Sequence, residues 1–164
     1  MNNGLLIWIF PIAVTLHNLE EAIWLPGWSQ ERAGRWHQPV GPQSFRIAVS
    51  VLTLIAFLLA AWTHIRGSGS LGYYLLLAYA LGQGLNVFFP HVLGTIATRT
   101  YMPGLLSGIL FVLPAASVLL FRAFGAGHLD IGRFFAVAMI FIPLMLLSIP
   151  ILFRIGGTVC RFAI

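Results

Sequence analysis

Residues 45–64 read FRIAVSVLTLIAFLLAAWTH, a run in which Arg46 is the only charged side chain. A helix needs about 20 mostly apolar residues to cross the hydrocarbon core of a bilayer, and this run meets that length. Its apolar residues are continuous and do not alternate with polar ones, so the pattern is not that of a strand in a membrane barrel. The run therefore predicts a transmembrane helix.

Similar apolar runs lie on both sides of this one, separated by short polar breaks. We predict an all-α membrane protein whose residues 1–164 form one domain, a bundle of about five transmembrane helices. Asp130 stands just before the last run, where a side-chain acceptor can cap a helix. Several prolines lie inside the runs and are expected to kink the helices, because each removes a backbone donor. The predicted spans are residues 4–25, 45–64, 71–97, 103–121 and 131–153.

The overall composition also indicates a membrane protein and excludes an ordinary soluble domain. Hydrophobic residues make up 59% of the chain and charged residues 8%, whereas soluble domains carry roughly a quarter charged residues. The net charge of +5 comes from arginines scattered near the ends of the apolar runs. These positions suit anionic lipid head groups better than nucleic acid. Membrane lipids are therefore the expected partners, and nucleic acid is not.

The arginines also predict how the chain is oriented. With five spans the termini lie on opposite sides, and cytoplasmic loops are usually the more basic ones. Three arginines fall on one side and six on the other. We therefore expect a multi-pass protein of the plasma (inner) membrane, with its N-terminus outside and its C-terminus in the cytoplasm. The smaller group is Arg66, Arg122 and Arg133, and the larger group is Arg32, Arg35, Arg46, Arg99, Arg154 and Arg161.

The first predicted span contains His17-Asn18-Leu19-Glu20-Glu21, which places an imidazole and two carboxylates among apolar residues. An ionisable group at the centre of a spanning helix costs about 2.5 to 3.5 kcal/mol, so such groups usually mark a functional site. Helical geometry puts Glu20 and Glu21 on either side of His17, and both carboxylates can approach the same imidazole or ion. A plainer explanation is that these groups reach the head-group region from the helix end, which suits one acid better than two.

The third predicted span contains a second polar group, formed by Asn86 and His91. The first and third spans cross in the same direction, and the depths of the two polar groups differ by only a few Å, so the groups can meet. Pro90 also frees the carbonyl of Asn86 from its helical hydrogen bond. Asn86 and His91 could instead be ordinary hydrogen-bonding partners between helices.

The run His17-Asn18-Leu19-Glu20-Glu21, followed by an Asn and a His later in an apolar chain of this size, resembles the HXXEE family. These are small multi-spanning prokaryotic membrane proteins named for that motif, and the resemblance covers most of the chain. It implies that His17, Glu20 and Glu21 match the family's defining positions. It does not imply a reaction, because the family's activity is unassigned.

Our first hypothesis is a metal-dependent hydrolase that acts on a lipid or other apolar substrate. A divalent metal such as zinc would be bound by three side chains, with one position left for water and the second glutamate as general base. The predicted metal ligands are His17, Glu21 and His91, the predicted catalytic residues are His17, Glu20 and Glu21, and the predicted substrate contacts are Asn86 and Trp24.

Two alternatives remain open. A metal-free isomerase or cyclase of isoprenoid or steroid-like lipids would use one protonated and one ionised glutamate beside His17 as acid and base. Transport of a proton or cation ranks lower, because the polar residues gather at one depth and do not form a path across the membrane.

Other residues carry weaker signals. His64 and His128 fall at span ends on the opposite side, where an interfacial histidine is the plainer explanation, and His37 lies in a polar segment. Gly104 and Gly108 form a G-x-x-x-G pattern in the fourth span, which permits close approach of another helix.

Overall fold

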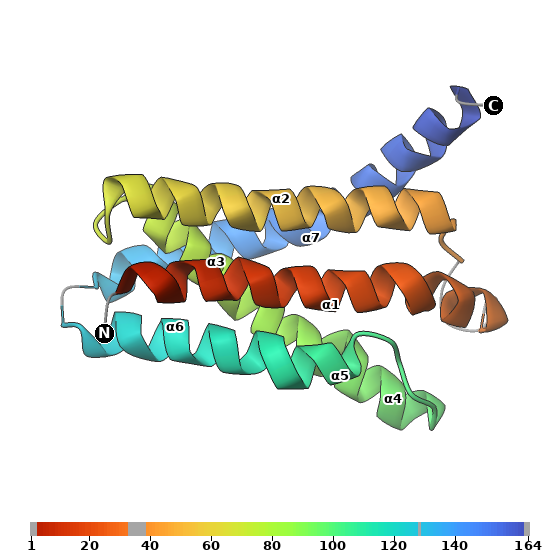
Figure 1. Cartoon of the computed structure of the whole chain (residues 1–164), viewed down its shortest axis with the longest axis horizontal. Helices are drawn as coiled ribbons and strands as arrows, with labels where there is room; N and C mark the ends of the chain where they lie inside the picture. Colours follow the sequence, from red (N-terminus) through yellow and green to blue (C-terminus); the bar gives the residue numbers. More distant parts are fainter. Residues whose placement is uncertain (1–2, 33–38, 128, 163–164) are drawn as a thin grey trace.

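The computed structural model describes residues 3–32, 39–127 and 129–162, and every regular element in these ranges is helical. The elements are α1 (Asn3–Glu31), α2 (Pro42–Arg66), α3 (Leu71–Asn86), the π-helical η1 (Val87–Val92), α4 (Leu93–Thr98), α5 (Leu105–Ser107), the π-helical η2 (Gly108–Val112), α6 (Leu113–Gly125) and α7 (Ile131–Phe162). The long helices run roughly along one axis, and α1 begins at the opposite end of the bundle from the end of α7 (Figure 1).

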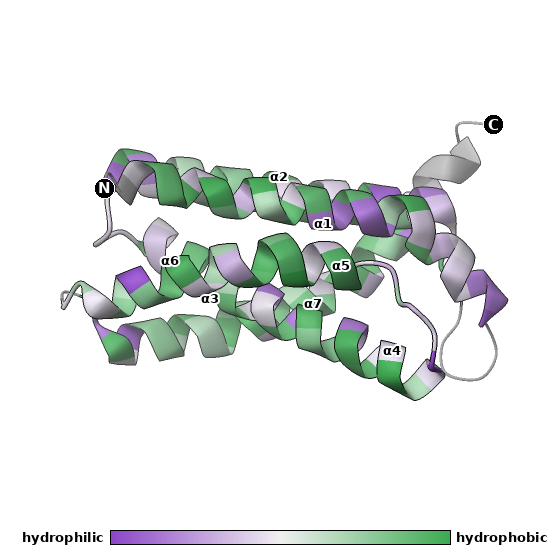
Figure 2. Ribbon diagram, turned by 60° about the horizontal axis from the view of Figure 1, so that its bottom comes forward, coloured by the Kyte–Doolittle hydropathy of each residue, from purple (hydrophilic) through white to green (hydrophobic). Residues whose placement is uncertain are grey.

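Five helical segments are long and apolar enough to cross a membrane. They are Gly4–Glu31, Pro42–Arg66, Leu71–Thr98, Leu105–Gly125 and Ile131–Thr158. Hydrophobic residues dominate the middle of the helices, and hydrophilic residues are more frequent toward their ends (Figure 2). The predicted fold class and number of spans are therefore confirmed.

The first span is longer than predicted, because α1 continues past Leu25 and Pro26 to Glu31. A proline within a helix leaves the carbonyl four residues earlier without its usual donor. That carbonyl belongs to Ala22, and it accepts a hydrogen bond of 3.3 Å from Arg46 Nε on α2. A side chain of the neighbouring helix thus replaces the missing donor, and the predicted loop does not begin at Pro26.

The other spans also differ from the predicted bounds. Hydropathy marks where the apolar run stops, whereas backbone hydrogen bonding can continue into polar residues. The observed bounds are Pro42 in place of residue 45, Arg66 in place of 64, Thr98 in place of 97, Leu105 and Gly125 in place of 103 and 121, and Thr158 in place of 153. The start of the last span is as predicted, and Asp130 Oδ1 caps it by accepting a hydrogen bond of 2.9 Å from Arg133 N.

The third span is interrupted at Pro90. Phe89 has φ −130° and ψ 110°, outside the helical region, and the residue before a proline is expected to avoid that region. The Phe89–Pro90 peptide bond is cis. The predicted proline kink is therefore present in this span, and His91 follows it directly.

The centre of the bundle is α3, which packs against α2, α6 and α7. Tyr79 on α3 is fully buried, and its hydroxyl donates a hydrogen bond of 3.0 Å to the carbonyl of Leu52 on α2. Its ring also meets Phe10 of α1 edge-on, with 5.9 Å between the ring centres. In contrast, only 11% of the most apolar stretch of α7 is buried within the bundle. This suits a helix whose apolar side chains face lipid.

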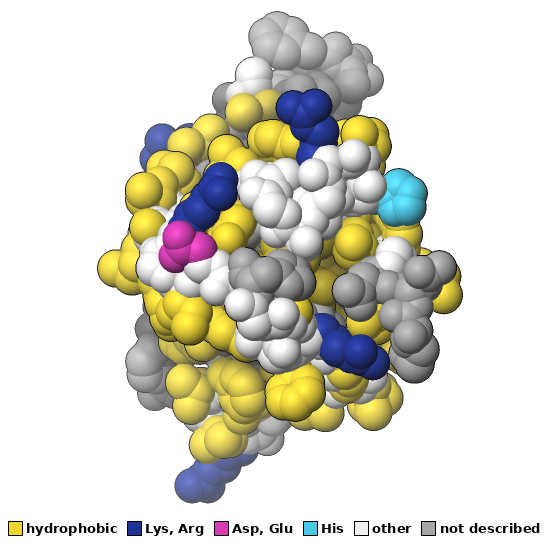
Figure 3. All heavy atoms as spheres, turned by 90° about the vertical axis from the view of Figure 1, so that its left-hand side faces the viewer, with side chains coloured by type: hydrophobic (Ala, Val, Ile, Leu, Met, Phe, Trp, Pro, Cys, Tyr) yellow, Lys and Arg dark blue, Asp and Glu magenta, His cyan; other side chains and the backbone are white. Residues whose placement is uncertain are grey.

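Basic side chains are exposed at the end of the bundle where α2 joins α3 and α6 joins α7 (Figure 3). The three arginines that the sequence assigned to one side lie in the last turns of α2 and α6 and the first turn of α7. They are Arg66, Arg122 and Arg133. These three arginines therefore lie at the same end of the bundle, as the sequence predicted.

Asn18 links α1 to α2. Its Nδ2 donates hydrogen bonds to Thr53 Oγ1 at 2.7 Å and to the Val49 carbonyl at 3.2 Å. Polar contacts between spanning helices contribute about 0.6 kcal/mol on average and about 1.7 at most, so Asn18→Ala should lower the free energy of unfolding within that range. Reversible unfolding in mixed detergent and SDS micelles, followed by circular dichroism, measures this. The control is Thr15→Val, which removes only a bond within α1, and an equal loss in both variants would contradict the prediction.

Candidate metal centre

The first two groups of the site come from the buried face of α1. His17 is fully buried and Glu21 is 8% exposed. Residues four apart lie one above the other on a helix, and His17 Nε2 is 3.8 Å from Glu21 Oε1. An imidazole and a carboxylate thus point into the same buried space inside the bundle.

The third group is His91, which the break at Pro90 places against α1. Its imidazole is fully buried, and its Nε2 lies 3.1 Å from Glu21 Oε1. The rings of His17 and His91 are nearly perpendicular, with 5.0 Å between their centres. The structure therefore brings together the polar groups of the first and third spans, as the comparison of their depths predicts.

The side-chain amide of Asn86 lies between the two imidazoles. Its Nδ2 is 3.4 Å from His17 Nε2 and 3.3 Å from His91 Nε2. An amide nitrogen can only donate, so each Nε2 must offer its lone pair to this contact. His91 Nε2 then has no proton to donate to Glu21. The contacts among these four side chains therefore cannot all be hydrogen bonds at the same time.

Ser107, in the first turn of the fourth span, and Gly104, just before that span, close the site. Ser107 Oγ is 3.2 Å from His17 Nδ1. Gly104 has φ +96°, and a Cβ there would lie 2.8 Å from His91 Nδ1 and 3.0 Å from His17 Cε1. The G-x-x-x-G pattern indicated a close approach at Gly104, but nothing in the sequence pointed to Ser107.

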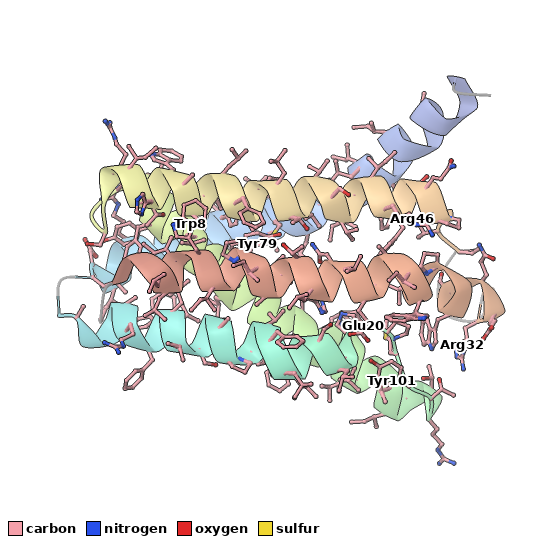
Figure 4. All side chains as sticks on the ribbon, in the orientation of Figure 1. Trp8, Glu20, Arg32, Arg46, Tyr79 and Tyr101 are labelled. Atoms are coloured by element: carbon pink, nitrogen blue, oxygen red, sulfur yellow. The ribbon has the colours of Figure 1, made fainter. Side chains whose placement is uncertain are left out.

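Glu20 points to the fourth span and not to the imidazoles. Its Oε1 accepts hydrogen bonds from Gly104 N at 2.9 Å and from the hydroxyl of Tyr101, and its Oε2 accepts one from Ser107 N at 2.9 Å. Glu20 and Tyr101 face each other between α1 and the start of α5 (Figure 4). Of the two carboxylates expected beside His17, the structure places only Glu21 in contact with it.

The remaining predicted residues lie elsewhere. Trp24 is 57% exposed, and no described contact joins it to the two imidazoles. His64 lies at the opposite end of the bundle, where its ring is 6.0 Å from that of Trp8. His37 and His128 fall outside the residues that the structure describes.

Comparison with known proteins identifies the family. The sequence profile described as "Protein of unknown function with HXXEE motif" matches residues 8–119. The chain belongs to the HXXEE family. A relative, "Uncharacterized protein YrkK" of Bacillus subtilis (strain 168), is 33% identical over 151 residues, which cover 92% of this chain and 94% of that protein. No solved structure matches the chain.

The HXXEE motif and its surroundings fit a small metal ion. His17, Glu21 and His91 each offer one ligand atom, and the three atoms lie within 4.8 Å of one another. Zinc bonds of about 2.0 to 2.1 Å in a tetrahedron would separate neighbouring ligand atoms by about 3.3 Å. The separations of 3.1 and 3.8 Å between Glu21 Oε1 and the two Nε2 atoms bracket that value. Two imidazoles and one carboxylate are also a donor set that zinc and ferrous iron accept.

An apolar groove of about 960 Å³ begins beside this site. Leu25 lies one turn after Glu21 on α1, and Pro90 directly precedes His91; both line the groove. Arg32 lines it as well, near the end of α1. Its apolar lining includes Leu25, Trp28, Phe89, Pro90, Leu93 and Phe153. The wall of the groove is thus close along the chain to Glu21 and His91, although neither side chain lines it.

Proposed function

We propose that the protein is a membrane-embedded, metal-dependent enzyme, a hydrolase that acts on a lipid or other apolar substrate. The observation that carries this proposal is the convergence of His17 Nε2, His91 Nε2 and Glu21 Oε1. When neither Nε2 carries a proton, the three atoms present lone pairs to one another, and a cation among them would make that contact favourable. A carboxylate and two imidazoles buried without such a partner would be costly.

Each side chain of the site has a separate role in this proposal. His17, Glu21 and His91 would hold the ion. Ser107 Oγ would accept a hydrogen bond from the Nδ1–H group of His17, which leaves the Nε2 lone pair of His17 for the ion. When bound, a divalent ion such as zinc supplies a Lewis acid that polarises the substrate and activates water. With an ion bound, the two Nε2 lone pairs would no longer accept from the amide of Asn86, which could then orient a substrate group beside them.

The position of Glu20 changes its proposed role. A general base needs a lone pair that faces the reacting water, but Glu20 already accepts hydrogen bonds from Tyr101, Gly104 and Ser107. The metal-free isomerase or cyclase requires two carboxylates at one imidazole, and only Glu21 is in contact with His17. These contacts favour the metal-dependent proposal over that alternative.

We also propose an orientation, with the N-terminus outside the plasma membrane and the C-terminus in the cytoplasm. The six arginines of the larger group support it through the excess of positive charge on cytoplasmic segments. Glu21 lies ten residues before Glu31, the end of α1, or about 15 Å along the helix axis. The site would then lie in the cytoplasmic half of the bilayer.

The metal content of purified protein tests the proposal. Wild type, His17→Ala and His64→Ala are produced with zinc, iron or manganese supplied, purified in detergent and analysed by mass spectrometry for metals. We expect about one ion per chain in wild type and in His64→Ala, whose histidine is exposed at the other end of the bundle, and almost none in His17→Ala. Near-zero metal in all three proteins with every ion would contradict the proposal.

The hydrolase activity needs its own measurement. Membrane lipid extracts are incubated with wild type or His17→Ala, and released fatty acids and head groups are measured by mass spectrometry. We expect products only with wild type, and their loss on addition of a chelator.

A further inference from the structure

Glu20 holds the segment 101–107 in place. This segment connects α4 to the start of the fourth span and contains Gly104 and Ser107, which both contact the imidazoles. The carboxylate of Glu20 is the common acceptor for the hydroxyl of Tyr101 and for the backbone N–H groups of Gly104 and Ser107. One side chain on α1 therefore fixes the segment at three points.

Tyr101 is suited to this contact. Partial burial, and then the hydrogen bond to Glu20, raise the pKa of its phenol, so the phenol keeps the proton that it donates at neutral pH. Its oxygen also accepts a hydrogen bond of 3.2 Å from Leu106 N. Tyr101 thus ties the carboxylate to the first turn of the fourth span.

The fixed segment acts directly on the two imidazoles. The backbone of Ser107 is bound to Glu20, while its hydroxyl is 3.2 Å from His17 Nδ1. Gly104 N is bound to the same carboxylate, and the residue lies against both rings. A histidine whose Nδ1 proton has an acceptor keeps its Nε2 lone pair available for a metal.

We infer that Glu20 is a positioning residue, which holds the segment 101–107 against His17 and His91 without binding the metal itself. The inference rests on the proposed metal site and assigns different tasks to the two neighbouring glutamates of the motif. Glu21 is a ligand, and Glu20 secures the partner of a ligand. Glu20 holds the backbone of Ser107, and the hydroxyl of Ser107 in turn contacts the imidazole of His17.

Glu20→Gln tests this inference with little change in side-chain shape. The amide nitrogen of glutamine cannot accept a hydrogen bond, so at least one of the three donors loses its partner. Loss of outer partners of metal ligands lowers affinity about 10- to 100-fold, and we expect that loss in Glu20→Gln and in Ser107→Ala. The control is Glu31→Gln on the same helix, whose side chain is 77% exposed and which should bind as wild type does.

The double variant shows whether the two residues act together. If Glu20 acts through Ser107, the loss in the double variant should be about as large as in either single one and not their product. Affinity is measured by competition with a chromophoric zinc chelator, and the visible spectrum of bound Co²⁺ should change in both single variants. Wild-type affinity and spectrum in Glu20→Gln, or fully multiplicative losses, would overturn the inference. If Glu20→Gln does not fold, Tyr101→Phe removes only one donor and should give a smaller loss in the same direction.

A measurement without metal separates this inference from the proposed function. Nitrogen-15 NMR of labelled histidine in micelles reports which ring nitrogen of His17 carries the proton. We expect Nδ1–H in wild type and a mixture of the two forms in Glu20→Gln. Absence of metal from wild type would reject the proposed function, whereas an unchanged His17 signal in Glu20→Gln would reject the positioning role.

Discussion

Replacing Glu21 with glutamine is expected to lower the affinity for zinc by more than about 100-fold, because a direct ligand should contribute more than the 10- to 100-fold of an outer partner. Glu21 Oε1 is the carboxylate oxygen that approaches both imidazoles, at 3.1 Å from His91 Nε2 and 3.8 Å from His17 Nε2. Glutamine has the same shape but no negative charge, so the packing of α1 is retained while the ligand is lost. Chelator competition measures the change.

Glu20→Gln provides the comparison for this prediction. The two variants make the same chemical change at adjacent residues of one helix, so general effects on insertion and folding are matched. We expect the larger loss of affinity in Glu21→Gln. Equal zinc binding by Glu21→Gln and wild type would show that this carboxylate does not hold the ion.

Gly104→Ala is expected to lower the free energy of unfolding by about 2 to 6 kcal/mol. The positive φ of Gly104 costs other residues about 1 to 3 kcal/mol, and forcing an extra methyl group into a packed site costs a similar amount. Here the methyl group would lie 2.8 Å from His91 Nδ1 and 3.0 Å from His17 Cε1. Unfolding in mixed micelles measures the stability, and metal binding should fall as well because the rings must move.

Gly84→Ala is the matched control for Gly104→Ala. Gly84 lies within α3, and a Cβ there would meet only Leu113 Cδ2, at the ordinary distance of 3.9 Å. Alanine is the better helix former by about 1 kcal/mol, so this variant should be as stable as wild type or more so. Equal stability of the two variants would contradict the prediction, because it would show that a methyl group fits between Gly104 and the two rings.

The spans and the meeting of two polar groups could be predicted from sequence because they depend on local patterns. Long apolar runs identify the five helices, and regular helix geometry gives the depth of each polar group. His17 and His91 were therefore expected to be close, and their ring centres are 5.0 Å apart. The spacing between His17 and Glu21 likewise follows from the helix alone.

The partners of individual atoms could not be predicted in this way, because they come from distant parts of the chain. Helical geometry allowed Glu20 to turn toward His17, but donors on the segment 101–107 draw it in another direction. The same reason explains the helix through Pro26, since Arg46 on the next span supplies the missing donor. Side-chain contacts between spans depend on packing that hydropathy does not specify.

The break that places His91 in the site also affects when an ion could first be held during biosynthesis. The proposed ligands His17 and Glu21 both lie on the first span, and two ligands on one helix would leave the proposed set incomplete. The third proposed ligand, His91, would join them only after two more helices have been synthesised and have docked. Metal loading would therefore be a late event, and a loaded chain would be one whose helices have already assembled.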